Sequence, residues 1–184
     1  MTIQEPIHFL DRPIAITDLE TTGLDPTIHE IIDVGLIVIH PQTFEILFTL
    51  DKKVKPRHIE MATPKALEVN GYNETEWVHA PDLKSVMETY ATFAKNAVFC
   101  SHNITFDWAF MEVAFKKTEV LNTMDYHRLD LFTMACVLLR KRGLTKFRLK
   151  NICEFLDIPP EPDMHRAFNG TFSAYEVYKK LAEL

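Results

Sequence analysis

The sequence predicts a single α/β domain, and two patterns along its 184 residues lead to this fold class. The first third contains three apolar runs rich in Ile, Val, Leu and Phe, separated by short turn segments, which is typical of an antiparallel meander. The rest of the chain has helical spacing, interrupted by a short apolar run at 97–101 that predicts a buried strand. A small mixed sheet followed by a helix-rich half indicates an α/β domain with flanking helices.

The predicted elements follow one another with short connections. The three strands of the meander are expected over 13–19, 30–40 and 45–54. Asp130 can cap the helix that follows it, and Gly143 stands just past the end of that helix. No repeat or flexible linker divides the chain, so one domain over 1–184 is expected. Helices are expected over 64–69, 83–95, around 106–114, and over 131–142, 149–156 and 164–182.

Composition places the chain among folded proteins without a membrane or secretory signal. With 47% apolar and 25% charged residues, the sequence is close to the globular average. The three cysteines are spaced as core thiols, and no apolar run reaches the length of a membrane span, so a cytoplasmic protein is expected. The net charge of -6 argues against tight non-specific binding of duplex DNA. A nucleic-acid enzyme that concentrates carboxylates around cations is still compatible with that charge.

Asp18 and Glu20 stand two positions apart at the end of the first predicted strand. The alternation of side chains along a strand places both carboxylates on the same face. Two like charges on a buried strand repel each other and lose hydration, and a bound divalent cation resolves that conflict. Taken alone, a pattern this short is more often an exposed strand end that carries an incidental pair of acids.

A second charged feature is a basic segment at 140–150 that holds six Lys or Arg residues and no acid. Such a segment can bind the phosphate backbone of a nucleic acid. The alternative is a solvated helix end and loop without a ligand.

Three short motifs carry a resemblance to a known family. They are DLETTGL at 18–24, HNITFD at 102–107 and HRAF at 165–168. In order and separation they resemble the motifs of the DEDDh, or DnaQ-like, 3'-5' exonucleases. This family includes the proofreading subunit of bacterial replicative polymerase, ribonuclease T and oligoribonuclease. The resemblance runs from about Pro13 to Leu184 and implies a ribonuclease H-like fold.

The resemblance also implies roles for individual residues. Asp18, Glu20 and Asp107 match metal-binding acids of a site for two Mg²⁺ or Mn²⁺ ions, and His165 matches the general base. A neutral histidine can take a proton from water at physiological pH. The residues expected to hold the terminal nucleotide are Thr22, Leu24 and Phe106, with Leu24 and Phe106 as simple core residues the alternative. Asn103 is expected to cap the helix that carries Asp107.

The third motif departs from the family pattern at Gly170, where the family has a metal-binding Asp. Glycine inside a helix also lowers stability by roughly 0.5–1 kcal/mol relative to Ala, so no stability argument favours it. The positions one turn away carry no carboxylate, and Asp163 in the preceding loop is the acid that could take its place. The substitution is compatible with an engineered site, with a natural enzyme of weakened catalysis, or with a pseudo-enzyme.

The resemblance therefore implies a metal-dependent enzyme that hydrolyses 3' ends of single-stranded DNA or RNA to nucleoside 5'-monophosphates, with activity reduced at Gly170. The alternative is an inactive module that binds nucleic acid through the same cleft, or a subunit associated with a polymerase. A homodimer is possible within the family, and no membrane partner is expected.

Overall fold

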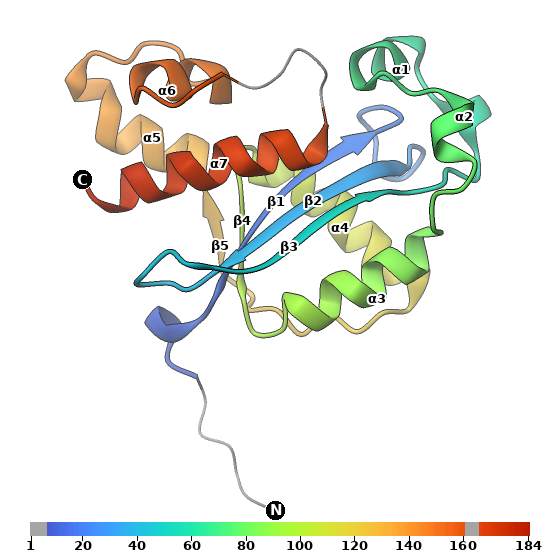
Figure 1. Cartoon of the computed structure of the whole chain (residues 1–184), viewed down its shortest axis with the longest axis horizontal. Helices are drawn as coiled ribbons and strands as arrows, with labels where there is room; N and C mark the ends of the chain where they lie inside the picture. Colours follow the sequence, from blue (N-terminus) through green and yellow to red (C-terminus); the bar gives the residue numbers. More distant parts are fainter. Residues whose placement is uncertain (1–6, 161–165) are drawn as a thin grey trace, which may run out of the picture.

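A five-stranded sheet forms the centre of the protein in the computed structural model, which describes residues 7–160 and 166–184 (Figure 1). The strand order is β3-β2-β1-β4-β5. The first three strands pair antiparallel, and β4 and β5 continue the sheet parallel to β1. The mixed sheet confirms the predicted fold class. The strands are β1 (Ile14–Thr21), β2 (Ile31–Ile39), β3 (Ile46–Lys53), β4 (Val98–Ser101) and β5 (Arg128–Asp130).

The helices agree with the predicted pattern except at short elements. The prediction missed β5 and the four-residue α2, because neither is long enough to show a periodic apolar pattern. Asp130 caps α5 as expected, and a 3-10 turn at 140–142 leads to Gly143, whose φ of 103° lies in the left-handed region. The helices are α1 (Pro64–Asn70), α2 (Glu74–Trp77), α3 (Leu83–Phe93), α4 (Ile104–Thr118), α5 (Leu131–Leu139), α6 (Leu149–Phe155) and α7 (Ala167–Ala182).

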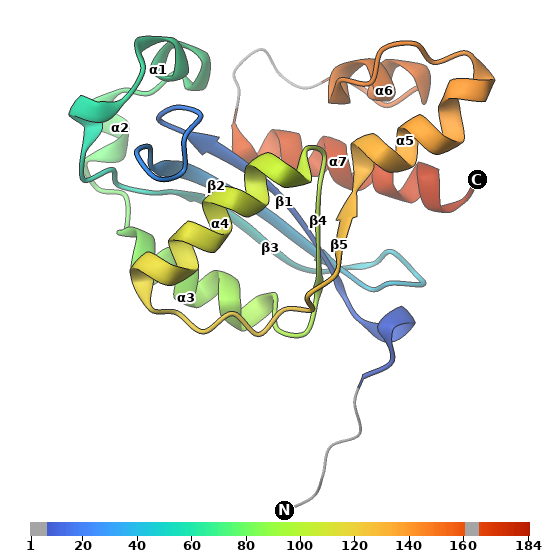
Figure 2. The same ribbon diagram turned by 180° about the vertical axis from the view of Figure 1, so that it is seen from behind.

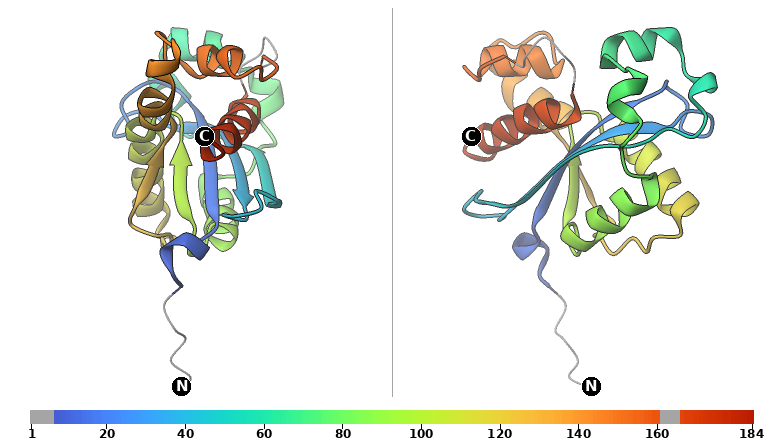
Figure 3. Two further views of the ribbon diagram at one scale, coloured as in Figure 1. Left: turned by 90° about the vertical axis from the view of Figure 1, so that its left-hand side faces the viewer. Right: turned by 45° about the vertical axis from the view of Figure 1, so that its right-hand side comes forward.

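The sheet is covered by helices on both faces (Figures 2 and 3). Alternation along β1 sends Ile14 and Ile16 into one apolar cluster with α5, α6 and α7. Ala15 and Leu19 point the other way, into a second cluster with α3 and α4. Within the described ranges, no helix combines the length and apolar character needed to cross a membrane.

The last helix, α7, lies very close to the sheet where it begins. A Cβ added at Gly35 of β2 would stand 2.4 Å from the carbonyl oxygen of Ala167 and 2.2 Å from Oγ1 of Thr171. Larger buried side chains, including Val177 and Tyr178, lie further along the helix. The start of α7 therefore depends on small residues on both sides of the contact.

Candidate active site

Asp18 and Glu20 lie near the end of β1, half-buried and on the same face of the sheet, as the sequence predicts. Leu19 between them is buried on the opposite face. The register of the β1–β2 ladder shifts between Glu20 and Thr21. Such irregularities alter the local direction of side chains, and here the irregularity directly follows the two acids.

Asp107 comes from the first turn of α4, in the helical layer behind the sheet. Its side chain is buried, with only 3% of the residue exposed. Burial raises the pKa of Asp107 from 3.8 to about 7, while Ser101 and the backbone around Leu19 act in the opposite direction. A cation beside this carboxylate would favour its ionised form.

These acids line one pocket of about 650 Å³ at the carboxyl ends of β1 and β4. Phe106 and Gly170 line it as well, and the basic side chains of Arg148 and Lys150 complete its rim. Carboxylates from two distant segments therefore share a cavity with the basic side chains of a third segment. We call this cavity the acid pocket, defined by Asp18, Glu20, Phe106, Asp107, Arg148, Lys150 and Gly170.

The carboxylate of Asp18 fills the space where a side chain at position 170 would begin. A Cβ added at Gly170 would lie 2.3 Å from Oδ2 and 2.9 Å from Cγ of Asp18 but 3.5 Å from its Cβ, so the conflict concerns the carboxylate group of a rotatable side chain. In the described part of the chain, no three His, Cys, Asp or Glu residues are grouped closely enough to hold a metal ion. The oxygen donors of the acid pocket nevertheless suit hard divalent cations chemically.

The start of α4 has the predicted residue at its N-cap position but lacks the predicted capping hydrogen bond. Asn103 occupies the N-cap position, but its side chain makes no capping hydrogen bond and instead accepts one from Oγ1 of Thr105 at 3.0 Å. Asp130 at the end of β5 accepts from the backbone N–H of Ile104 at 3.3 Å while it also caps α5. One carboxylate therefore joins the starts of the two helices beside the acid pocket.

The three residues expected to hold a nucleotide have different surroundings. Phe106 is half-buried in the acid pocket and contacts Phe110, while Leu24 is 82% exposed on the loop after β1 and is not a core residue. Thr22 is buried, and its backbone N–H and C=O are bonded to Glu30 and Thr63. Of the three, the acid pocket contains only Phe106.

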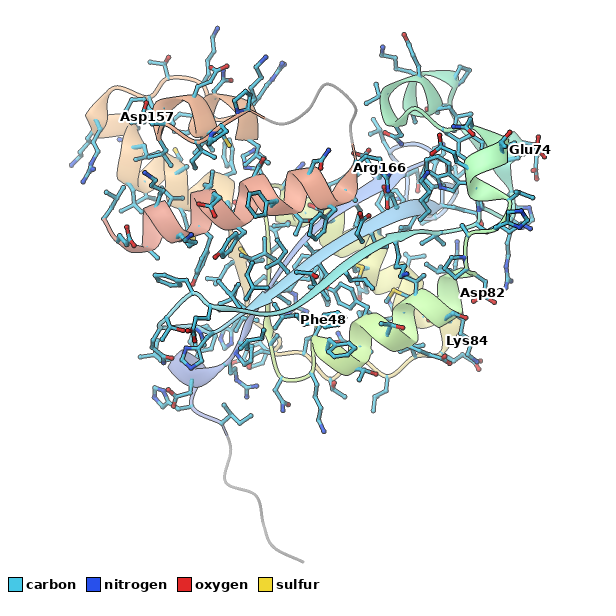
Figure 4. The ribbon with its side chains drawn as sticks, viewed as in Figure 1. Phe48, Glu74, Asp82, Lys84, Asp157 and Arg166 are labelled. Atoms are coloured by element: carbon cyan, nitrogen blue, oxygen red, sulfur yellow. The ribbon has the colours of Figure 1, made fainter. Side chains whose placement is uncertain are left out.

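The third motif is only partly described, because Asp163 and His165 lie outside the described residues. The next residue, Arg166, anchors the start of α7 across the sheet (Figure 4). Its Nε donates to Oδ2 of Asp33 on β2 at 2.7 Å, and its Nη2 lies 3.4 Å from Oδ1 of Asp51 on β3. Asp33 is 1% exposed, so burial raises the pKa of its carboxyl, and Arg166 opposes that change.

We expect Arg166→Leu to reduce the free energy of unfolding by on the order of 3 kcal/mol, because the change leaves a buried carboxylate without its partner. The loss should be larger at pH 8 than at pH 5. A carboxyl whose folded-state pKa is raised binds its proton more readily when folded, so stability falls as the pH rises through that pKa. Urea unfolding measures the effect. The double variant Asp33→Asn/Arg166→Leu should recover most of the loss, and a double variant as unstable as Arg166→Leu would contradict this account.

Some residues that line the acid pocket stand out in the sequence, but their place in the pocket is seen only in the structure. Arg148 and Lys150 belong to the basic segment that was expected to contact a phosphate backbone, and the structure brings them to the acids. His102 precedes Asn103 in the second motif and lines the same cavity. Cys153 on α6 also lines it, although the sequence marked this thiol only as a core residue.

Comparison with known proteins gives relatives over nearly the whole chain. The DNA polymerase III PolC-type protein of Thermotoga petrophila is 27% identical over 179 residues, which is 96% of this chain and 12% of that protein. The corresponding protein of Bacillus subtilis is 23% identical over 173 residues, with 94% and 12% covered. The chain thus spans about an eighth of the length of these curated relatives.

Solved structures show the same fold at low identity. The nuclease domain of 3'hExo, a DEDDh family member bound to rAMP, has a TM-score of 0.76 at 14% identity, with 93% of this chain and 92% of that chain covered. Exonuclease I of E. coli with a dT13 oligonucleotide has a TM-score of 0.76 at 17% identity, with 94% and 41% covered. The exonuclease family RNase_T matches residues 15–178. This match over most of the sequence shows that the chain belongs to the DnaQ-like 3'-5' exonucleases.

Proposed function

We propose that the acid pocket is the active site of a metal-dependent exonuclease that removes nucleotides from 3' ends of single-stranded DNA or RNA. The observation that carries this proposal is the meeting of Asp18, Glu20 and Asp107 in one pocket with Arg148 and Lys150. Carboxylates suit divalent cations, and the basic side chains suit the phosphates of a strand. The expected products are nucleoside 5'-monophosphates.

In this proposal, Asp18, Glu20 and Asp107 hold Mg²⁺ or Mn²⁺. When bound, two such ions supply the positive charge that activates an attacking water and stabilises the leaving oxygen of an in-line displacement. Burial of Asp107 matches this role, since a desolvated carboxylate gains most from a neighbouring cation.

Other residues orient the strand and move a proton. Phe106 offers an aromatic surface to the terminal base, and the exposed Leu24 lies on the loop that would approach the same nucleotide. The backbone N–H and C=O of Thr22 already form hydrogen bonds within the protein, so residues next to Thr22 on this loop would make its contacts with the nucleotide. His165 is proposed as the general base that takes the proton from the attacking water.

A second candidate function is binding without efficient hydrolysis, and the surroundings of Gly170 favour it over a fully active site. The fourth acid of the family is absent, and the Asp18 carboxylate occupies its space. A hard-cation site with fewer negative ligands binds its ions more weakly. We therefore propose reduced activity, with partial or single-ion occupancy.

The likeness to PolC-type polymerases extends the proposal to a partner. These relatives are DNA polymerases, and this chain matches about an eighth of their length. Association with a polymerase is therefore a proposed context for the chain, and a homodimer is the alternative.

The proposed function is tested by degradation of a 5'-labelled single-stranded oligonucleotide, as DNA and as RNA, with Mg²⁺ or Mn²⁺. We expect a ladder that shortens from the 3' end, faster with Mn²⁺, and absent in the variant Asp18→Ala/Glu20→Ala. Loss of the ladder in this variant excludes a contaminating nuclease. Intact strands that remain bound with both metals would support the pseudo-enzyme instead.

A further inference from the structure

A second hollow adjoins the acid pocket at the carboxyl ends of β4 and β5. It has a volume of about 570 Å³, within the range of ligand sites, and it shares His102, Asn103 and Arg148 with the acid pocket. Phe132 and Phe147 form its apolar wall. We call it the aromatic groove, defined by His102, Asn103, Asp130, Phe132, Phe147 and Arg148.

The two aromatic rings of this groove are placed to receive a flat ligand. Phe132 stands in the first turn of α5 and is 47% exposed, although it is a large apolar side chain. Its ring packs edge-to-face against Phe147, with the centroids 6.0 Å apart. Phe147 is half-buried and supports Phe132 from the side. Any of the nucleobases can stack on an aromatic ring of this kind, because every base has a π face.

Among the polar groups of the groove, Arg148 is the one that suits the phosphate of a nucleotide. Arg148 is exposed at the boundary with the acid pocket and can pair with a phosphate that bridges the two hollows. Asp130 contributes the acidic group of the wall, but its oxygens already accept from the N–H groups of Ile104 and Thr133. Nδ1 of His102 is buried without a hydrogen-bond partner among residues 7–160 and 166–184.

We propose that the aromatic groove binds the nucleotide that precedes the 3'-terminal one in a single strand, with its base on Phe132 and its phosphate on Arg148. This inference rests on the proposed function, because it takes the acid pocket as the site of the terminal nucleotide. The shared wall of His102, Asn103 and Arg148 makes the two hollows continuous, as adjacent nucleotides require.

The test compares a ligand that fills one hollow with a ligand that fills both. Thymidine 5'-monophosphate and the unlabelled tetranucleotide dT4 are titrated by calorimetry, with Ca²⁺ in place of Mg²⁺. We expect Phe132→Ala to weaken the binding of dT4 about tenfold and to leave the binding of the mononucleotide unchanged. Phe132→Trp should keep dT4 binding, because it restores an aromatic face.

The matched control is Phe93→Ala on α3, since Phe93 is 46% exposed but lies on the opposite face of the sheet. It should leave the binding of both ligands unchanged. Equal binding of dT4 by the unmodified protein and Phe132→Ala, or an equal loss for both ligands, would overturn the inference. Tight binding of dT4 in Ca²⁺, together with no hydrolysis of dT4 in Mg²⁺ or Mn²⁺, would instead count against the proposed catalysis and leave the groove assignment standing.

Discussion

Replacing Gly170 by Asp is expected to raise exonuclease turnover by about two orders of magnitude, which corresponds to about 3 kcal/mol of transition-state stabilisation. The new carboxylate supplies the ligand that the family has at this position. Because a Cβ at residue 170 would lie 2.3 Å from Oδ2 of Asp18, the Asp18 side chain must rotate to admit it. Two adjacent carboxylates repel, so the variant should be less stable than the unmodified protein in EDTA and should regain stability with Mn²⁺.

Two matched variants separate the effects of volume, charge and ligand position. Gly170→Ala adds the Cβ without a carboxylate, so it should reveal the steric conflict with Asp18 and give no gain in turnover. Asn169→Asp adds the same charge one residue earlier on the same helix, about 100° away around its axis. Steady-state hydrolysis and thermal unfolding with and without Mn²⁺ measure both properties. Equal turnover of Gly170→Asp and the unmodified protein would mean that another group supplies the ligand.

Replacing Asp107 by Asn is expected to reduce turnover by about a thousandfold and to stabilise the metal-free protein above neutral pH. Turnover falls because a proposed metal ligand is lost. The metal-free protein gains stability because burial raises the pKa of Asp107 from 3.8 to about 7, so the ionised carboxylate is unfavourable in the folded state. Between these values the folded state binds the proton more tightly than the unfolded state, so stability falls as the pH rises from about 4 to about 7. An uncharged Asn removes this dependence.

The melting temperature between pH 5 and pH 8, in EDTA and in Mg²⁺, tests this prediction. Mg²⁺ should flatten the fall of the unmodified protein, because a cation stabilises the ionised carboxylate. Asp82→Asn is a suitable control, since Asp82 caps the distant α3 and Asn also serves as an N-cap (Figure 4). It should leave turnover and the slope between pH 5 and pH 8 unchanged. A slope that survives in Asp107→Asn would assign it to another group.

The sequence was sufficient for most of the fold because its strands and longer helices have clear periodic patterns. The three-stranded meander is present as predicted, and Gly71 ends α1 with a φ of 59°. The strand β5 was not predictable, because its three residues include only one apolar side chain. The start of α7 at Ala167 cannot be compared with the predicted start at Met164, which lies outside the described residues.

The candidate site was predictable where it depends on local motifs, but not where it depends on contacts between distant segments. The common face of Asp18 and Glu20 follows from strand alternation alone. The bond from Ile104 to Asp130 joins residues 26 apart, and that from Arg166 to Asp33 joins residues 133 apart. No spacing in the sequence indicates such partners. For the same reason, the closeness of Arg148 to the acids is known only from the structure.

The buried residues of α7 are small at the start of the helix, near the acids, and larger further along it. Ala167 and Gly170 allow the start of the helix to lie close to β1 and β2. The larger Val177 and Tyr178 are buried in its far half, and Tyr178 lies about 12 Å along the helix axis from Gly170. A methyl group added at Gly35 would meet the carbonyl oxygen of Ala167 and Oγ1 of Thr171, so β2 or the start of α7 would have to shift. Since Gly35 also pairs with Asp18 in the β1–β2 ladder, the missing side chain at this position on β2 helps to set how closely α7 approaches the acids.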